Sequence, residues 1–133
     1  MDSAGAAIKK VANESPASAA DGVSARAFER YQHHYQAING QFSEVYDGVL
    51  EGLVALRALG WPLACVTNKP TAFAQALLRT KGLDGFFVLT LGGDALARKK
   101  PDPLPLLVAC QRLGVDPVHT VMIGDSSNDA QAA

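Results

Sequence analysis

With 133 residues the chain is long enough for one domain at most, and a hydrophobic content of 48% is enough for a packed core. The charge is nearly balanced, with 12 basic and 13 acidic residues, which argues against nucleic-acid binding because such binding needs a basic surplus. No apolar run approaches the roughly 20 residues that a membrane helix needs, and Lys9 and Lys10 interrupt the apolar N-terminal stretch. The sequence therefore predicts neither a membrane span nor a signal peptide.

The two cysteines indicate the compartment. Cys65 and Cys110 lie within apolar runs, which is typical of reduced core residues in a cytoplasmic protein. No spacing between cysteine and histidine suggests a zinc site. We therefore predict a cytoplasmic protein without structural zinc, and the sequence leaves its oligomeric state open.

The first 45 residues are predicted to be mainly helical. Gly5–Val11 has the composition of a short helix, and apolar residues recur at three- to five-residue steps over Val23–Ile38. The Asn-Gly pair that follows is a natural end for this second helix. His33 and His34 lie side by side within it, and adjacent helix positions point about 100 degrees apart, so the pair is a poor joint metal ligand. We interpret both as surface or core histidines.

From residue 49 onward, helical and strand-like patterns alternate. Glycines at positions 60, 82 and 114 follow the three helical patterns and mark their ends. Strands that alternate with helices favour an α/β fold with a parallel sheet. The expected helices cover residues 49–59, 71–80 and 103–113, and the expected strands cover residues 62–67, 86–91 and 120–124.

The end of the last predicted strand is the first candidate site. The apolar run 121–123 ends at Gly124, and Asp125 and Asp129 follow. Ligands bind beyond the carboxyl ends of strands in open α/β sheets. Two carboxylates at such an edge suit Mg²⁺, which prefers oxygen ligands and keeps waters for a phosphate. The alternative is that Asp129, or Asn128 beside it, only caps a helix.

Two earlier stretches could bind a phosphate at the same edge of the sheet. Thr67 and Asn68 directly follow a predicted strand, where a hydroxyl, backbone N–H groups and the next helix N-terminus can hold phosphate oxygens. Lys100 precedes a stiff Pro-Asp-Pro segment, which would fix an ammonium group against a phosphoryl group. Each has a simpler alternative: a helix cap for the first pair and a solvated loop lysine for the second.

In this order the three stretches resemble the haloacid dehalogenase superfamily of phosphohydrolases, and within it the bacterial phosphoglycolate phosphatases. The segments that carry the resemblance are VTNKP at 66–70, KPDP at 100–103 and IGDSSNDAQAA at 123–133. The resemblance implies a doubly wound, Rossmann-like parallel sheet, incomplete in this chain. It also implies a shortened N-terminal helical cap segment over residues 1–45 and a partial α/β phosphatase core over residues 46–133.

The resemblance also implies roles for individual residues. Thr67 would bind the phosphoryl group with Asn68 beside it, and Lys100 would neutralise the charge of the phosphate and of the nucleophile. Asp125 would ligate Mg²⁺, and Asp129 would ligate or orient it. The implied reaction is hydrolysis of a small phosphorylated metabolite, with 2-phosphoglycolate as the expected substrate.

The family's nucleophile is an aspartate in a D-x-D-G-T segment, and this chain has no such segment. None of its nine aspartates lies two positions from another. Met1 to Ala4 resemble the residues that follow this segment in the family, and the family continues past the position of Ala133. We therefore expect a chain truncated at both ends. The alternative is a non-catalytic remnant or protein-interaction module, and a mutase, a pyrophosphatase or a dehalogenase of the same superfamily is a lesser rival.

Overall fold

The computed structural model describes residues 20–40 and 43–133. The helix predicted over Gly5–Val11 lies outside these residues. The chain divides into two compact units, residues 1–41 and residues 42–133. Within the described residues, every helix is too short or too polar to cross a lipid bilayer.

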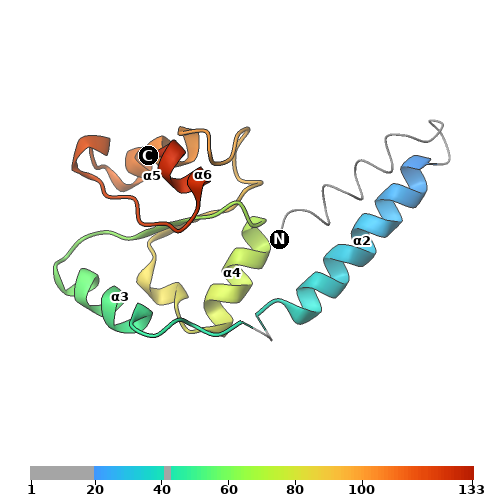
Figure 1. Ribbon diagram of the computed structural model, residues 1–133, viewed down its shortest axis with the longest axis horizontal. Helices are drawn as coiled ribbons and strands as arrows, with labels where there is room; N and C mark the ends of the chain where they lie inside the picture. Colours follow the sequence, from blue (N-terminus) through green and yellow to red (C-terminus); the bar gives the residue numbers. More distant parts are fainter. Residues whose placement is uncertain (1–19, 41–42) are drawn as a thin grey trace. The chain divides into compact units, whose positions relative to one another are not determined.

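The described part of the first unit is a single helix, α2, which spans Ala20–Ile38 (Figure 1). Its C-terminal end is where the sequence predicted it. Tyr31 and Tyr35 are one turn apart and stack with ring centroids separated by 5.8 Å. His33 and His34 are both exposed, in agreement with a surface position.

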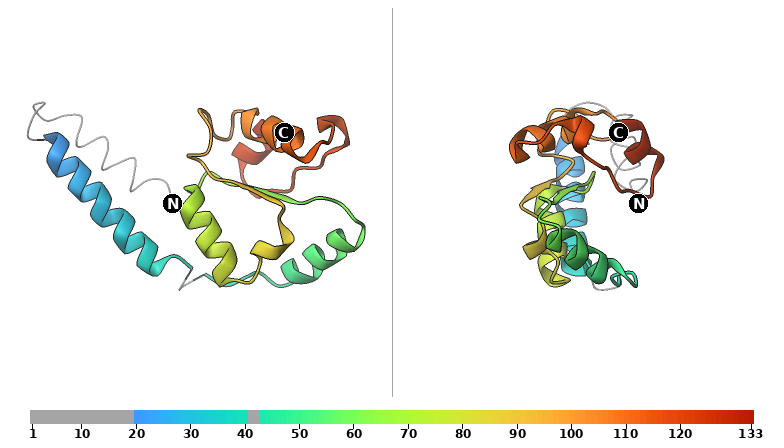
Figure 2. Two further views of the ribbon diagram at one scale, coloured as in Figure 1. Left: turned by 180° about the vertical axis from the view of Figure 1, so that it is seen from behind. Right: turned by 90° about the vertical axis from the view of Figure 1, so that its left-hand side faces the viewer.

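The second unit contains a small parallel sheet with helices on both faces. Strands β1 (Ala64–Val66) and β2 (Leu89–Leu91) pair in parallel, with Ala64 opposite Leu89 and Val66 opposite Leu91. Helix α4 (Thr71–Thr80) contacts β2, and helix α5 (Leu104–Leu113) contacts both strands, from opposite sides in the views of Figures 1 and 2. The remaining elements are α3 (Val49–Ala58), η1 (Asp84–Phe86), η2 (Pro117–His119) and α6 (Ser127–Ala132).

The core lies where α4 and α5 cover the sheet. Leu91 is only 2% exposed, and Phe73 and Ala74 of α4 and Ala109 and Cys110 of α5 are also buried. Because one face of each helix is apolar and buried, the helix pattern could be read from the sequence. Both cysteines are free thiols, with Cys110 buried, as the apolar runs around them indicated.

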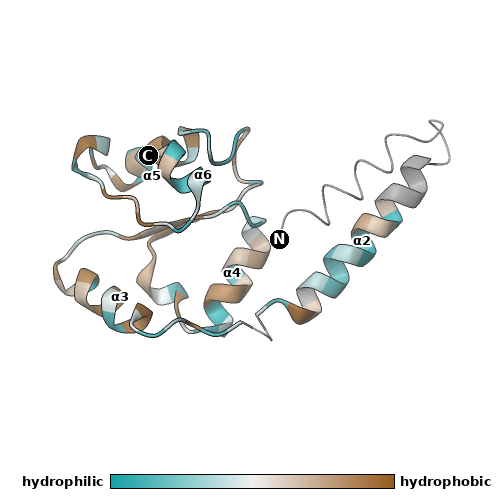
Figure 3. Cartoon of the chain, viewed as in Figure 1, coloured by the Kyte–Doolittle hydropathy of each residue, from teal (hydrophilic) through white to brown (hydrophobic). Residues whose placement is uncertain are grey.

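The strand predicted over residues 120–124 does not form, so this prediction was wrong. These residues are irregular coil, with Val121 79% and Ile123 76% exposed, and Figure 3 colours them as a hydrophobic stretch. A strand needs a hydrogen-bonding neighbour, and β1 pairs with β2 on its other edge. The free edge of β1 and the stretch 120–124 instead border an apolar cavity of about 530 Å³. Its walls include Leu63, Cys65, Val66, Leu106, Val121 and Ile123.

Candidate active site

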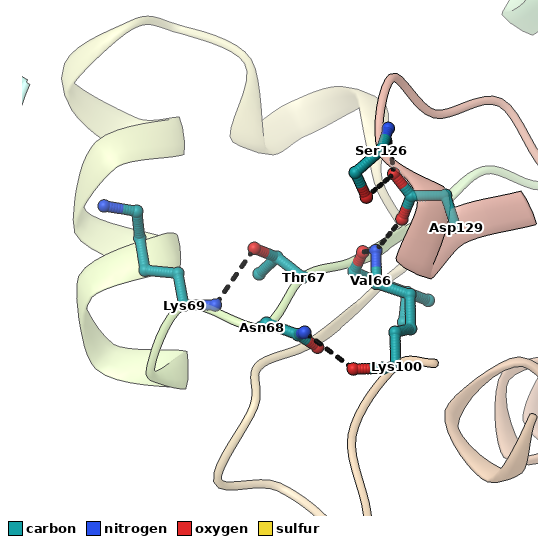
Figure 4. A network of polar contacts seen from close by, with 7 residues as sticks. All are labelled: Val66, Thr67, Asn68, Lys69, Lys100, Ser126 and Asp129. Carbon is teal, nitrogen blue, oxygen red and sulfur yellow. Dashed lines mark hydrogen bonds and ion pairs between the residues drawn. The ribbon is translucent and has the colours of Figure 1, made fainter. Parts of the chain in front are cut away.

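The site begins where β1 ends. Thr67 continues the ladder by one residue, because its backbone N–H donates to the Leu91 carbonyl oxygen at 2.9 Å. Its hydroxyl oxygen accepts a hydrogen bond from the backbone N–H of Lys69 at 3.2 Å (Figure 4). Neither Thr67 nor Asn68 caps the following helix, whose N-cap position is Pro70 without a side-chain cap bond. The capping alternative for this pair is therefore not what the structure shows.

Lys100 is the buried cation of the site, with 8% of its surface exposed. Its ammonium group donates to the Asp129 carboxylate at 2.5 Å and to the Val66 carbonyl oxygen at 2.6 Å. An ammonium has three N–H donors, so these two bonds leave one for a ligand oxygen. A solvated loop lysine, the simpler alternative, would be exposed. Figure 4 shows the lysine between the end of β1 and the start of α6.

The backbone around Lys100 is fixed from both sides. The Asn68 amide donates to the Lys100 carbonyl oxygen at 2.8 Å, so the residue after β1 holds the lysine loop directly. The Lys100–Pro101 peptide bond is cis. Two residues further on, the Asp102 carboxylate accepts from the backbone N–H of Leu104 at 2.9 Å and pairs with Arg98. The lysine is thus anchored between β1 and the first turn of α5.

Asp129 holds Lys100 with one oxygen and caps α6 with the other. Its second oxygen accepts from the Ser126 backbone N–H at 3.1 Å, which is one of the two bonds of a capping box between these residues. The same oxygen also accepts from the Ser126 hydroxyl at 2.7 Å. Gly124 lies against this carboxylate, and a Cβ at that position would collide with it. The capping alternative is therefore observed for Asp129, together with an ion pair that the sequence did not predict.

These contacts lower the pKa of Asp129 from its ordinary value of 3.8 to about 2. The main cause is the hydrogen bond from Lys100, and the hydrogen bonds from Ser126 act in the same direction. The carboxylate is 7% exposed and is still held ionised, because its donors favour the charged form. At neutral pH the Asp129 carboxylate is therefore ionised where it contacts Lys100.

We predict that acid weakens the fold through this pair. A depressed pKa contributes stability that is present above pH 3.8 and is lost as the pH falls through about 2. At pH 7, denaturant unfolding should give wild type a higher free energy of unfolding than Asp129→Asn. This difference should shrink by on the order of 1 kcal/mol as the pH falls towards 2. Ser127→Ala, an exposed change in α6 that removes no titrating group, is the control and should keep a constant difference from wild type. A constant difference for Asp129→Asn as well would contradict the prediction.

The candidate metal ligands are not equivalent. Asp125 is exposed and follows Gly124, whereas both oxygens of Asp129 are already hydrogen bonded. The residues that the structure describes hold no group of three or more acidic, histidine or cysteine side chains fit for a metal. Mg²⁺ is commonly held by one or two carboxylates, waters and a substrate phosphate, so Asp125 alone fits such a ligand. Asp129 instead fits an orienting role.

The helix N-terminus that the sequence assigned to phosphate binding is partly used within the protein. The backbone N–H of Thr71, the first residue of α4, donates to the Asp94 carboxylate at 2.8 Å, and the Thr71 hydroxyl donates to the same oxygen at 2.6 Å. This N–H is therefore engaged by a protein carboxylate. The sequence analysis missed both Asp94 and Ser126, because their partners depend on loop geometry and not on a residue pattern.

A buried lysine–aspartate pair beside a hydroxyl, at the end of a parallel strand, places the chain among α/β proteins with a polar site at the strand ends. The sequence profile of the haloacid dehalogenase-like hydrolases matches residues 6–133, so the chain belongs to this family. The resemblance found from the sequence is thus confirmed.

Individual relatives agree with this assignment. The chain is 50% identical over 109 residues to the phosphoglycolate phosphatase of Thiobacillus denitrificans. The aligned region covers 82% of this chain and 48% of that protein. It is 46% identical over 107 residues to the plasmid-encoded phosphoglycolate phosphatase of Cupriavidus necator. Here the aligned region covers 80% of this chain and 46% of that protein. The chain therefore spans about half the length of the curated relatives that it matches.

Solved structures show the same fold. A predicted phosphoglycolate phosphatase from Haemophilus somnus superposes with a TM-score of 0.76 at 36% identity, over 92% of this chain and 53% of that one. A HAD phosphatase from Thermococcus onnurineus superposes with a TM-score of 0.68 at 30% identity, over 77% of this chain and 47% of that one. The α/β fold predicted from the alternation of helices and strands is thus confirmed.

Proposed function

We propose that the chain forms part of a Mg²⁺-dependent phosphatase that hydrolyses a small phosphate monoester, with 2-phosphoglycolate as the substrate of the whole protein. The observation that carries this proposal is Lys100. It is a buried cation at the carboxyl end of β1, held by Asp129 and the Val66 carbonyl oxygen, with one N–H left for a ligand. The names of the relatives support the substrate.

In the proposed site each residue has a separate task. Thr67 and Asn68 bind phosphoryl oxygens, and Lys100 neutralises charge that builds up on the phosphate as the reaction proceeds. Asp129 holds Lys100 in position through their hydrogen-bonded ion pair. Asp125 is the proposed Mg²⁺ ligand, and the ion would supply charge stabilisation to the same phosphate.

The nucleophile is proposed to lie on a strand that fills the apolar cavity beside β1. A strand there would pair with the free edge of β1 and give residues 120–124 the neighbour that they lack. An aspartate at its carboxyl end would attack phosphorus and displace the alcohol, and water would hydrolyse the aspartyl-phosphate. The alternative is a non-catalytic or protein-interaction role without this group.

We propose that residues 1–45 form part of a helical cap segment and that residues 46–133 form part of an α/β phosphatase core. The partner is then a small phosphorylated metabolite, and neither nucleic acid nor a membrane. We further propose a cytoplasmic location, since such metabolites and reduced thiols are found there.

The metal site can be tested on the chain directly. Calorimetric titration with Mg²⁺ should show weak binding that Asp125→Asn removes, because the chain offers few carboxylates to offset dehydration of the ion. Asp84→Asn, which removes an exposed carboxylate from η1, should bind like wild type. Unchanged Mg²⁺ binding in Asp125→Asn would count against the proposed ligand.

A further inference from the structure

The loop after β2 lies directly against the segment that carries Thr67 and Asn68. This loop consists of Gly92, Gly93 and Asp94, and we call it the 92–94 clasp. The Gly93 backbone N–H donates to the Lys69 carbonyl oxygen at 2.9 Å. Thr67 is also bonded to Leu91, and Thr71 to Asp94. Every second residue from 67 to 71 is therefore hydrogen bonded either to the end of β2 or to the 92–94 clasp.

The two glycines of the clasp are required by this close approach. A Cβ at Gly92 would collide with the backbone and hydroxyl of Thr71, and a Cβ at Gly93 would collide with the Asn68 carbonyl group. Neither glycine has a positive φ, so backbone freedom does not explain them. Their role is to let one backbone lie against the other.

Asp94 closes the clasp with a side chain. One of its oxygens accepts both the backbone N–H and the hydroxyl of Thr71, across 23 residues of sequence. These bonds lower the pKa of Asp94, with the Thr71 hydroxyl as the main cause. Asp94 thus supplies the cap that the local sequence of α4 does not provide, since Pro70 has no side-chain donor or acceptor.

We infer that Asp94 is a positioning residue for the phosphate site, because the 92–94 clasp fixes the backbone from Thr67 to Thr71 on one side. This inference rests on the proposed function. On the other side, the Asn68 amide holds the Lys100 carbonyl oxygen at 2.8 Å. Release of the clasp therefore disturbs Thr67 and Asn68 directly and the Lys100 loop through Asn68. The side chain of Asp94 is hydrogen bonded to Thr71 and not to Thr67, Asn68 or Lys100.

The experiment compares three variants of the full chain with inorganic phosphate as the probe. Asp94→Ala removes the acceptor, Asp94→Asn keeps an oxygen that can accept both bonds, and Asp116→Ala is the matched control. Asp116 also caps a short helix, by accepting from the Val118 backbone N–H at 3.0 Å, but this helix is η2 and not α4. Phosphate affinity is measured by ³¹P nuclear magnetic resonance titration. Amide hydrogen exchange at Thr67 and Gly93 reports the clasp independently.

We expect Asp94→Ala to weaken phosphate binding about fivefold, the scale of the net contribution of one typical hydrogen bond, and to lose amide protection at both positions. Asp94→Asn should stay within about twofold of wild type, and Asp116→Ala should leave affinity and both amides unchanged. A purely structural cap would give Asp94→Ala wild-type affinity, and that result overturns the inference. So does an Asp94→Asn variant as weak as Asp94→Ala, since charge and not placement would then matter.

Failure of the proposed function looks different. If the wild-type chain binds no phosphate, the proposed site is wrong and the positioning role is overturned with it. The exchange data then still decide whether the clasp holds the backbone from Thr67 to Thr71.

Discussion

Lys100→Met should lower the free energy of unfolding by about 2–3 kcal/mol. The substitution keeps most of the apolar stem but removes the donor to Asp129 and to the Val66 carbonyl oxygen. Breaking a fully buried ion pair costs about 3–5 kcal/mol because the remaining charge stays buried without its partner. We expect somewhat less here, since Ser126 still donates to Asp129 and the neighbouring residues 125–127 are exposed to solvent.

A double-mutant cycle separates the ion pair from other effects of the change. In Lys100→Met/Asp129→Asn the second change removes the unpaired charge while it keeps an oxygen for the Ser126 cap. The double variant should therefore be less destabilised than the sum of the two single variants. Lys99→Met is the control at the exposed neighbouring position and should change stability by less than about 0.5 kcal/mol. Additive single effects, measured by urea unfolding, would show that the pair contributes no coupling energy.

Helices α4 and α5 could be predicted from the sequence because each one buries apolar residues and has a clear end. For α4 the predicted and observed bounds agree, and Gly114 follows α5 with a φ of 67°, a conformation that favours glycine. The strands were predicted too long at both positions. The predicted strands covered residues 62–67 and 86–91, whereas β1 and β2 each contain only three residues.

The stretch 120–124 shows what a sequence pattern leaves out. Its apolar residues have the composition of a buried strand, but a strand exists only with a hydrogen-bonding partner. The free edge of β1 is separated from this stretch by the apolar cavity. The apolar pattern alone therefore predicted the wrong conformation for Val121 and Ile123.

The candidate site was predictable as a set of residues but not as a network. Thr67, Asn68 and Lys100 were singled out because they follow strand ends or precede prolines, and the structure joins all three to β1. The partner of Lys100 is 29 residues away, and the partner of Thr71 is 23 residues away. Pairings over such distances depend on how loops pack. The bond from Lys100 to Asp129 and the bond from Thr71 to Asp94 therefore became visible only in three dimensions.

The chain alone should not hydrolyse 2-phosphoglycolate or an aryl phosphate. Thr67, Lys100 and Asp125 offer groups for a phosphate and a cation, but groups that hold substrate and transition state equally well accelerate nothing. None of the nine aspartates lies two positions from another, so the expected attacking carboxylate is not among them. Turnover by the unmodified chain with Mg²⁺ would contradict this prediction, and another carboxylate of the chain would then have to be sought as the attacking group.

Supplying the strand should change this result. We predict that a strand ending in Asp-x-Asp-Gly-Thr-Leu, fused ahead of Met1, together with a strand added after Ala133, produces Mg²⁺-dependent aryl phosphatase activity. The matched control ends in Asn-x-Asn-Gly-Thr-Leu. It should fill the same cavity and give the same gain in stability without activity, which separates completion of the sheet from the chemistry.

Within the active fusion, Lys100→Ala and Asp125→Asn should each lower the rate by about 100-fold or more, since each removes charge stabilisation that the transition state needs. An aryl phosphate is the appropriate substrate, because its hydrolysis does not depend on recognition of 2-phosphoglycolate. If the fusion folds, binds Mg²⁺ and remains inactive, the roles proposed for Thr67, Lys100 and Asp125 lose their support. If the asparagine control is equally active, the attacking group is elsewhere, and the strand acts only by completing the sheet.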